Sequence, residues 1–220
     1  MRSACRSLLA CILSASLISL PAFGAGAPNR PLGFVLAAQE AQLDGNSVAN
    51  GANIYDGDTV ATGPGGQVRL QFAGNQVYFS PSSVAKLTTN GSVVTAVLTS
   101  GTAGFMSARG GAVAIRALDV LVRPQTVQPT TAQVTVMAQD ELKVASVAGP
   151  LSLELDGETY TLTPGRTYGV KIVADNTKFQ EGYVGARKRR GLIIFVFAAT
   201  AAVAGGAYLY KELTESPDAP

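Results

Sequence analysis

Histidine and tryptophan are absent from this 220-residue sequence, and its only two cysteines, Cys5 and Cys11, lie near the N-terminus. Without histidine the chain has neither the commonest general base nor the commonest ligand of transition metals. Charged residues make up 15% of the chain and hydrophobic residues 47%, a balance that excludes an intrinsically disordered protein. These absences favour a folded protein that is not an enzyme, and we expect no catalytic residue, no cofactor and no metal site.

Both cysteines belong to a segment that is typical of a secretory signal peptide. Arg2 and Arg6 precede an apolar run over residues 8–20, and small residues follow it. We therefore predict a signal peptide over residues 1–24. A lipoprotein cleavage box ending at Cys11 is the alternative, and it fits poorly because the apolar run continues past that cysteine. After cleavage the chain would hold no cysteine, and hence neither a disulfide nor a thiol nucleophile.

An uncharged stretch of twenty residues, GLIIFVFAATAAVAGGAYLY, occupies positions 191–210 near the other end. A helix of that length rises by about 1.5 Å per residue and crosses a hydrocarbon core of about 30 Å. Tyr208 and Tyr210 lie where interfacial aromatic residues belong. We therefore predict a transmembrane helix over residues 191–210, followed by a short tail over residues 211–220. A buried core helix is the alternative.

A basic cluster, Arg187-Lys188-Arg189-Arg190, ends a tether that we predict over residues 176–190. Basic residues usually mark the cytoplasmic side of a transmembrane helix, whereas a signal peptide would place this cluster outside. Three explanations stay open. Export overrides the rule, the topology is inverted, or the cluster binds anionic lipid head groups outside the membrane.

The central region, residues 25–175, has the alternating apolar pattern and the turn dipeptides of an all-β domain. Its basic residues are scattered and not interleaved with aromatic residues, so we expect no nucleic-acid partner. We predict two packed antiparallel sheets, or a β-roll or jelly-roll-like domain. The expected strands cover residues 33–38, 68–72, 76–79, 93–98, 112–117, 119–123, 132–137, 142–147, 151–155, 159–162 and 167–173.

Two segments of this region share one pattern, VRLQFAGNQVYFSP from Val68 and LSLELDGETYTLTP from Leu151, at a constant offset of 83 positions. Each has an alternating apolar segment, a glycine turn, a second alternating segment and a closing proline. One hairpin used twice would suit two packed sheets or a β-roll. Chance matching of a common hairpin pattern is the rival explanation.

The stretch YDGDTVATGPGGQVRLQF, from Tyr55, offers the strongest candidates for a ligand-binding loop. Residues 63–66 lack the GK[ST] ending of a phosphate loop and precede a strand. Asp56 and Asp58 resemble the start of a calcium loop, but the ligands that should follow are missing. We therefore interpret both segments as turns, in which the aspartates accept backbone hydrogen bonds and residues 63–66 reverse the chain.

Two further groups of side chains have a functional and a structural interpretation. The carboxylates of Glu154, Asp156 and Glu158 could serve a glycosidase, but their alternation around an Asp-Gly turn favours a solvated hairpin. The aromatic residues could form a platform for sugars, although aromatic residues in strands usually belong to the core. These residues are Tyr55, Tyr78, Phe79 and Phe105.

The segment YDGDTVATGPGGQVRLQFAGNQVYFSPSSVAKL resembles the FecR-like domain, whose pattern is GD-x-[IV]-x-T-G, then alternating strands and a P-x-S turn. The resemblance is best over residues 33–104 and extends to about residue 172. It implies structural turn roles for Gly57, Asp58, Thr62, Gly63, Pro81 and Ser82.

The resemblance implies a β-rich envelope domain that binds proteins and does no catalysis. The best-known members of the family lie in the periplasm and report the occupancy of an outer-membrane iron-siderophore receptor. They relay this signal to an N-terminal cytoplasmic segment that controls a sigma factor. In this chain a predicted signal peptide stands in place of that segment, so we do not carry over sigma-factor control or iron.

We therefore predict an exported β domain on the periplasmic side of a bacterial cell envelope, anchored in the inner membrane by one C-terminal helix. It would act through contacts with an envelope protein, with envelope sensing or signalling as the implied context. The alternative is a binding module for cell-wall or surface polysaccharide. An exposed aromatic strip would favour that module, whereas an unpaired edge strand or an apolar patch would favour protein contacts.

Overall fold

The computed structural model describes residues 30–108, 112–174 and 190–197, which form strands and turns with no helix among them. The prediction of an all-β domain is therefore confirmed. The strands are β1 (Gly33–Leu43), β2 (Asn46–Ser47), β3 (Asn53–Ile54), β4 (Thr59–Phe72), β5 (Asn75–Phe79), β6 (Val84–Asn90), β7 (Val93–Ser100), β8 (Thr102–Ser107), β9 (Val113–Ala117), β10 (Val120–Pro124), β11 (Thr130–Ala138), β12 (Glu141–Ala148), β13 (Leu151–Leu155), β14 (Glu158–Leu162), β15 (Arg166–Ala174) and β16 (Arg190–Phe197).

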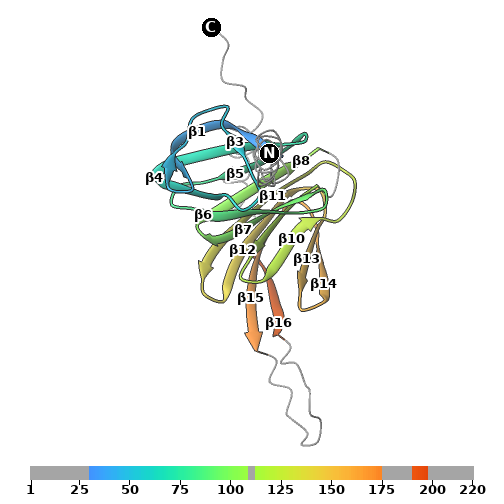
Figure 1. Cartoon of the computed structure of the whole chain (residues 1–220). Coiled ribbons are helices and arrows are strands. Elements are labelled where there is room, and N and C mark those ends of the chain that lie inside the picture. The colour runs from blue at the N-terminus through green and yellow to red at the C-terminus, as the bar shows by residue number, and fades with distance from the viewer. Residues whose placement is uncertain (1–29, 109–111, 175–189, 198–220) are drawn as a thin grey trace, which may run out of the picture. The chain divides into compact units, whose positions relative to one another are not determined.

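The strands form one continuous curled sheet, not two separate sheets (Figure 1). Its order is β14-β13-β10-β9-β7-β6-β4-β5-β8-β11-β12-β15-β16, and β1 pairs with β2, β3 and β4 beside this path. The curl brings β8 and β11 against β9 and β7, so that two halves of one sheet enclose the core. The pairs are antiparallel except that β7 and β9 run parallel, a mixed pairing that the sequence analysis did not predict.

Strand β4 connects the two halves, because its first residues pair with β6 and its last residues pair with β5. The prediction that residues 63–66 reverse the chain is wrong, since they continue β4 as a bulge of four residues. Opposite them, β1 supplies only Glu40, between the pairs Gln39↔Gln67 and Ala41↔Thr62. The bulge bends β1 and β4 together without ending either strand.

Gly66 shows why this bulge needs glycine. A Cβ atom at Gly66 would lie 2.4 Å from the carbonyl oxygen of Glu40 and 2.8 Å from the backbone nitrogen of Gly63. Only a residue without a side chain permits so close an approach of two backbones. The glycines that looked like a chain reversal in the sequence therefore serve a bend between paired strands.

One hydrophobic core fills the space inside the curl, and the alternation read from the sequence accounts for it. Along β4, Val68, Leu70 and Phe72 are buried while the residues between them are half-buried. Burial of a Leu or Phe side chain contributes about 1.5–3 kcal/mol relative to exposure. Residues of the core cluster also recur at every second position on β9, β10, β13 and β15, so strands from both halves contribute to this core.

The two hairpins that echo each other in the sequence are the same structure in the same register. Val68 pairs with Phe79 and Leu151 pairs with Leu162, each 83 positions apart from its counterpart. Both two-residue turns have positive φ at each position, 43° and 86° at Ala73-Gly74, and 50° and 89° at Asp156-Gly157. These values are those of a type I′ turn, whose twist matches paired strands.

The likeness extends beyond the hairpins to the residues that come after them. Ser82 donates its N–H to the carbonyl of Gly63 at 3.0 Å, and Gly165 donates to Ser146 at 2.7 Å. The four positions are again related by 83. In each case the next strand, β6 or β15, pairs with the strand segment before the hairpin. We call β4–β6 the first repeat and β12–β15 the second repeat, with β12 and β13 together corresponding to β4.

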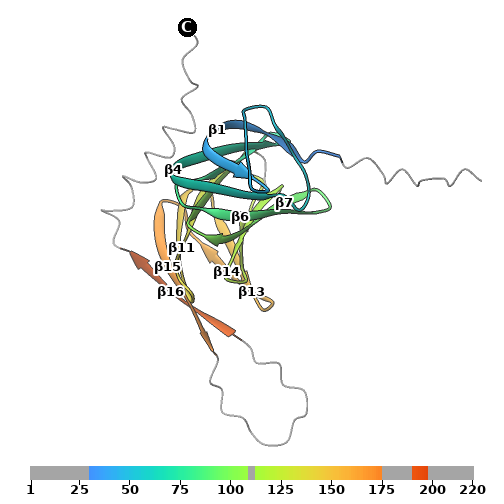
Figure 2. The ribbon, with the colours of Figure 1, turned by 60° about the vertical axis from the view of Figure 1, so that its left-hand side comes forward.

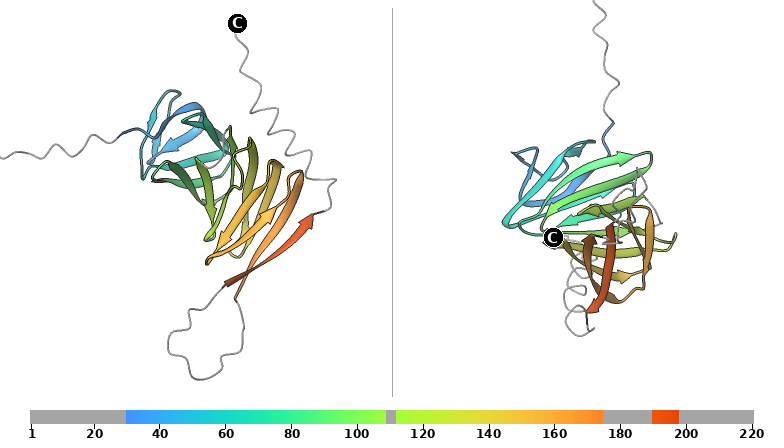
Figure 3. Two further views of the ribbon diagram at one scale, coloured as in Figure 1. Left: turned by 90° about the vertical axis from the view of Figure 1, so that its right-hand side faces the viewer. Right: turned by 90° about the horizontal axis from the view of Figure 1, so that it is seen from below.

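The two repeats differ in what covers their edges. In the first repeat, β5 also pairs with β8, while β6 pairs with β7, which in turn pairs with β9. In the second repeat, β14 pairs only with β13 among the described strands, and β15 pairs with β16, which has no further partner among them. Figure 3 (left) shows β15 and β16, in orange and red, at the end of the sheet remote from β1.

Strand β16 lies where the sequence predicts the start of the transmembrane helix. Residues Arg190–Phe197 pair with β15 over eight positions, from Thr167↔Phe197 to Ala174↔Arg190 (Figure 2). The run LIIFVF is rich in β-branched and aromatic residues, which favour strands, and a short apolar run does not distinguish a strand from a helix. Within residues 30–108, 112–174 and 190–197, no helix is long and apolar enough to cross a membrane.

Several predictions fall outside the described residues. The signal peptide over residues 1–24, most of the tether over residues 176–190, residues 198–210 of the predicted span and the tail over residues 211–220 all lie there. So do Arg187, Lys188 and Arg189 of the basic cluster, whereas Arg190 is the first residue of β16.

Candidate interaction surface

The turn at residues 55–58 is built as the sequence analysis predicted, with aspartates that satisfy backbone donors. The Asp58 carboxylate accepts the Tyr55 N–H at 2.8 Å, and the Asp56 carboxylate accepts the Thr89 N–H at 2.7 Å. Gly57, between them, has a φ of 95° and donates its N–H to Leu87 at 2.9 Å. The Asp58 carboxylate thereby closes the turn and the Asp56 carboxylate ties it to β6, and both roles are structural.

The remaining motif residues meet at the corner where β4 bulges. Thr62, which is buried, donates its hydroxyl to the Ser80 carbonyl at 2.6 Å and accepts the Ser83 N–H at 2.9 Å. Pro81 and Ser82 form the turn between these partners, and Ser82 has a φ of 56°. Ser83 is the serine of the P-x-S turn in the family pattern, and its buried hydroxyl bonds both the N–H and the carbonyl of Thr102.

Thus the structure brings Thr62, Gly63, Pro81 and Ser82 together, and it places Gly57 and Asp58 at a separate turn beside β6. The corner joins β4, β6 and β8 through hydrogen bonds to buried backbone groups, which are costly to leave unpaired. Thr62 and Gly63 also line a cavity of about 320 Å³ with residues of β1, and the six residues otherwise shape the scaffold.

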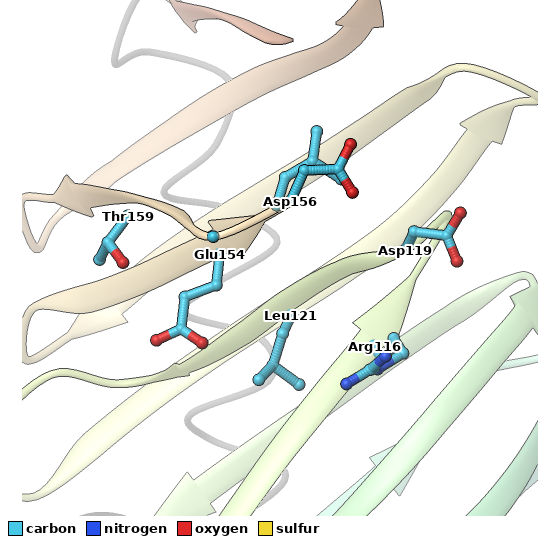
Figure 4. A pocket seen from close by; sticks show the side chains of 8 residues that line it. Arg116, Asp119, Leu121, Glu154, Asp156 and Thr159 are labelled. Carbon is cyan, nitrogen blue, oxygen red and sulfur yellow. The ribbon is translucent and has the colours of Figure 1, made fainter. Parts of the chain in front are cut away.

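Asp156 lines a cavity of about 490 Å³ over β9, β10, β13 and β14 (Figure 4). Arg116, Asp119 and Glu154 also line it, and Figure 4 shows the Glu154 carboxylate pointing away from those of Asp119 and Asp156. Glu154 forms an ion pair with Arg123. The carboxylates therefore do not converge on one point, as a glycosidase pair must.

The predicted hairpin accounts for all three acidic residues of this region. Asp156 forms the turn, and Glu154 and Glu158 flank it on paired strands. Glu158 accepts the Tyr160 hydroxyl at 2.6 Å and raises the pKa of Tyr160 above its ordinary value, with partial burial of Tyr160 acting in the same direction. Among the described residues, no group of three His, Cys, Asp or Glu side chains is placed to hold a metal ion.

The aromatic residues considered as a sugar platform belong to the core. Phe79 and Phe105 are fully buried, Tyr78 is 8% exposed, and Tyr55 is half-buried. The exposed aromatic side chains of the described region are instead Phe34 on β1 and the pair Phe195 and Phe197 on β16. The aromatic residues considered for a sugar platform therefore form no exposed strip, and the exposed aromatic pair of the described region lies on β16.

Strand β16 concentrates the exposed apolar surface. Of the eight large hydrophobic side chains that are exposed in the described residues, four lie on this strand. Ile193 is 53% exposed, Phe195 39%, Val196 51% and Phe197 41%. The strand also has one edge without a partner among the described strands. An apolar edge with free backbone groups is a template for pairing with another chain.

The two faces of β16 are distinct. Leu192 and Ile194 pack against the core, whereas Ile193, Phe195 and Phe197 point to the outside. The Phe195 ring covers Gly169 of β15, where a Cβ atom would lie 2.1 Å from the ring. Phe195 and Phe197 contact each other edge to face, with ring centroids 5.3 Å apart. The outer face of β16 is therefore an ordered apolar strip.

The sequence analysis missed this surface because it assigned the same residues to a transmembrane helix. The available signal was the run LIIFVF, which is of strand length and precedes alanine-rich sequence that is different in character. The polar edge strand β14 was predicted, but its position at the end of the sheet depends on long-range pairing that the sequence does not show.

No protein-family model matches this sequence, and a comparison with curated proteins finds no match. Two crystal structures of a proposed anti-sigma factor from Parabacteroides distasonis align with the chain at a TM-score of 0.48 and 15% sequence identity. The alignments cover 69% of this chain and 63% and 64% of the other chains, so this chain spans slightly less than two thirds of their length. A likeness of that size supports no inference about function.

Proposed function

We propose that this chain is an exported, non-catalytic β domain of a bacterial cell envelope that acts through protein–protein contacts. The observation that carries the proposal is β16, an edge strand with an exposed apolar face and no partner among the described strands. Such edges are rare in soluble monomers, because they recruit other chains. The resemblance of the turn motif to the FecR-like domain supports the same class of function, in envelope sensing or signalling.

The polysaccharide-binding alternative loses the aromatic platform that the sequence offered, since Tyr78, Phe79 and Phe105 are buried in the part of the chain that the structure describes. The cavity beside Asp156 presents an ion pair and carboxylates without a stacking surface for a sugar ring. We therefore retain protein contact as the proposed activity and propose no reaction.

A transmembrane helix over residues 191–210 and strand β16 cannot form at the same time, because they share residues 191–197. Residues 191–197 are part of the sheet, and they would have to leave it to enter a bilayer. The thirteen residues that remain, 198–210, are too few for a helix of about 20 residues. The anchor is therefore a separate proposal, which extraction of washed membranes with alkaline carbonate tests. An anchored chain stays in the pellet, and a chain with β16 in its sheet is released.

The contact proposal is tested with a photo-crosslinking amino acid at position 193 in living cells. Its matched control is the same amino acid at position 127, because Val127 is 81% exposed and lies between β10 and β11, away from the edge. We expect covalent adducts in the envelope fraction from position 193 and none from position 127. Equal labelling at both positions, or no labelling at either, would refute protein contact through β16.

A further inference from the structure

The chain contains two Asn-Gly pairs, Asn50-Gly51 and Asn90-Gly91, and all four residues are exposed. In such a pair the glycine backbone nitrogen can attack the asparagine side-chain amide, because glycine has no side chain to obstruct the approach. A Cβ atom at either glycine would meet no atom within 4 Å, so crowding is equally low at the two pairs. The hydrogen bonds around the reacting groups distinguish them.

The first pair is held at both reacting groups by strand β1. The side-chain oxygen of Asn50 accepts the Ala38 N–H at 2.9 Å, which keeps the carboxamide turned toward β1. Gly51 donates its N–H to the carbonyl of Val35 at 2.7 Å, so its nitrogen is engaged as well. An attack of the Gly51 nitrogen on the Asn50 side chain would have to break both hydrogen bonds, and this cost protects the pair.

The second pair has its reacting groups unbound. Neither the Asn90 carboxamide nor the Gly91 N–H has a hydrogen-bond partner among the described residues. The neighbouring groups are held instead, since Thr89 donates its N–H to the Asp56 carboxylate at 2.7 Å and its hydroxyl to the Gly91 carbonyl at 3.3 Å. Asn90 is also the last residue of β6, and the ends of strand ladders open at little cost in free energy.

We propose that Asn90 is a site of spontaneous deamidation and that Asn50 is protected from it. Hydroxide removes the amide proton of Gly91, whose nitrogen then forms a bond to the side-chain carbonyl carbon of Asn90. The bond from that carbon to the amino group breaks, and ammonia leaves. The resulting five-membered succinimide takes up one water molecule, which opens either of its two carbonyls. The product is an aspartyl or isoaspartyl residue at position 90, and no group is oxidised or reduced.

The modification changes the charge of a surface cavity. Asn90 lines a cavity of about 420 Å³ over β6, β7, β9 and β10, and the charged residues that line it are Arg116 and Arg123. Deamidation adds a carboxylate to this positively charged lining. The isoaspartyl product also inserts a methylene group into the backbone beside the pair Asn90↔Val93, which disturbs the end of the β6–β7 ladder. The two products therefore differ in their effect on the hairpin but not in charge.

Incubation of the full chain in mildly alkaline buffer, followed by proteolysis and mass spectrometry, tests the site. Asn50 is the control within the same molecule. We expect Asn90 to deamidate faster than Asn50 by about tenfold or more, because reaction at Asn50 must break two hydrogen bonds. The same incubation in concentrated urea should give comparable rates at the two positions, because neither hydrogen bond persists in the unfolded chain.

Two matched variants assign the product without proteolysis. Deamidation adds a negative charge, so ion-exchange chromatography should show an acidic species that accumulates with time. We expect Asn90→Gln to prevent this species, because the longer side chain would have to close a less favourable six-membered ring, and Asn50→Gln to leave it unchanged. Asn90→Asp provides the elution position of the aspartyl product. Circular dichroism checks that each variant keeps the fold.

Two outcomes would overturn the proposal. One is deamidation at Asn50 as fast as at Asn90 in the folded chain, which would show that the hydrogen bonds to β1 give no protection. The other is a folded chain that keeps Asn90 intact under conditions that deamidate the unfolded chain, which would show that the β6–β7 turn protects it. Neither outcome affects the proposed contact through β16, which crosslinking at position 193 tests separately.

Discussion

The two repeats share a hairpin register, a turn type and a corner hydrogen bond, but they end differently. The hairpin of the first repeat is inside the sheet, with β5 paired to β8. The hairpin of the second repeat is at the sheet's end, with β14 paired only to β13 among the described strands. The same hairpin structure is therefore an interior part of the sheet in the first repeat and an edge in the second. The difference arises because β8 pairs with the first hairpin, whereas no described strand pairs with the outer side of the second.

The two outer ends extend this comparison. The segment between β1 and β4 folds back over the β1 edge and satisfies its backbone groups. At the other end, β16 has exposed apolar side chains and no strand paired to its outer edge among the described residues, where the Tyr160 hydroxyl meets the Leu192 N–H. Proteins commonly block free edges by loops, bulges or charges, so an end without such protection is the place to look for a partner.

The largest expected effect tests whether the repeats are equally well packed. Leu70 and Leu153 occupy equivalent positions 83 residues apart, and both are fully buried. We expect Leu70→Ala and Leu153→Ala each to lower the free energy of unfolding by about 2–5 kcal/mol. Leu70→Ala should cost more, because strands surround it in the interior of the sheet, while the neighbourhood of Leu153 at the sheet's end can relax. Urea unfolding followed by circular dichroism measures both.

One result would contradict the expected difference between Leu70→Ala and Leu153→Ala. A larger loss for Leu153→Ala would show that the second repeat is the more tightly packed, and that the end of the sheet is not its weaker part. The control is Val127→Ala, at an exposed loop position, where we expect a change within about 0.5 kcal/mol.

The sequence predicted the strands well because their signal is local. Alternation in VRLQF and LSLEL identified core positions such as Leu70 and Leu153, and the turn dipeptides identified both hairpins. The hydrogen-bonding roles of Asp56 and Asp58 also followed from short-range rules for turns. These features depend on residues within a few positions of one another, which a single sequence contains.

The features that the sequence did not predict depend on distant partners. Residues 63–66 looked like a chain reversal, and only the approach of Glu40 from β1 makes them a bulge. Ser83 matched the P-x-S turn of the family pattern, but its hydrogen bonds to Thr102 appear only when β8 lies beside it. Residues 191–197 fit a helix or a strand equally well until β15 provides a ladder for them.

The next expected effect tests whether the two turns are equivalent. Gly74 and Gly157 have φ values of 86° and 89°, and a Cβ atom at either would meet no atom within 4 Å. Replacement by alanine therefore costs only the strain of a positive φ, about 1 kcal/mol in each case. Thermal unfolding of Gly74→Ala and Gly157→Ala should give the same loss within error. Asparagine at either position is the control and should cost less, because it tolerates this conformation.

Unequal losses at the two glycines would contradict the equivalence of the turns. A smaller loss at Gly157 would mean that the end hairpin adapts its turn, whereas a smaller loss at Gly74 would mean that interior neighbours hold the turn despite the strain. Either result would show which of the two repeats has the more adaptable turn.

The smallest effect concerns Tyr160 on the edge strand β14. The Glu158 carboxylate raises the pKa of Tyr160 above its ordinary value of 10.0, burial adds to the rise, and the Leu192 backbone N–H of β16 lowers it. We expect Glu158→Gln to lower the pKa of Tyr160, because the hydrogen bond to a charged acceptor and its repulsion of the phenolate are both lost. The chemical shifts of the Tyr160 ring carbons followed against pH report this titration.

The sign of the linked stability comes from the direction of the shift. A raised pKa in the folded state favours the protonated phenol, so the contribution is complete below the unfolded-state pKa and is lost as the pH rises through the folded-state pKa. The effect is confined to alkaline pH, and Glu158→Gln should reduce it. The matched control is Glu154→Gln, since Glu154 is bound by Arg123 on the neighbouring strand. A Tyr160 titration that responds to Glu154→Gln and not to Glu158→Gln would show that β14 is arranged differently at this end of the sheet.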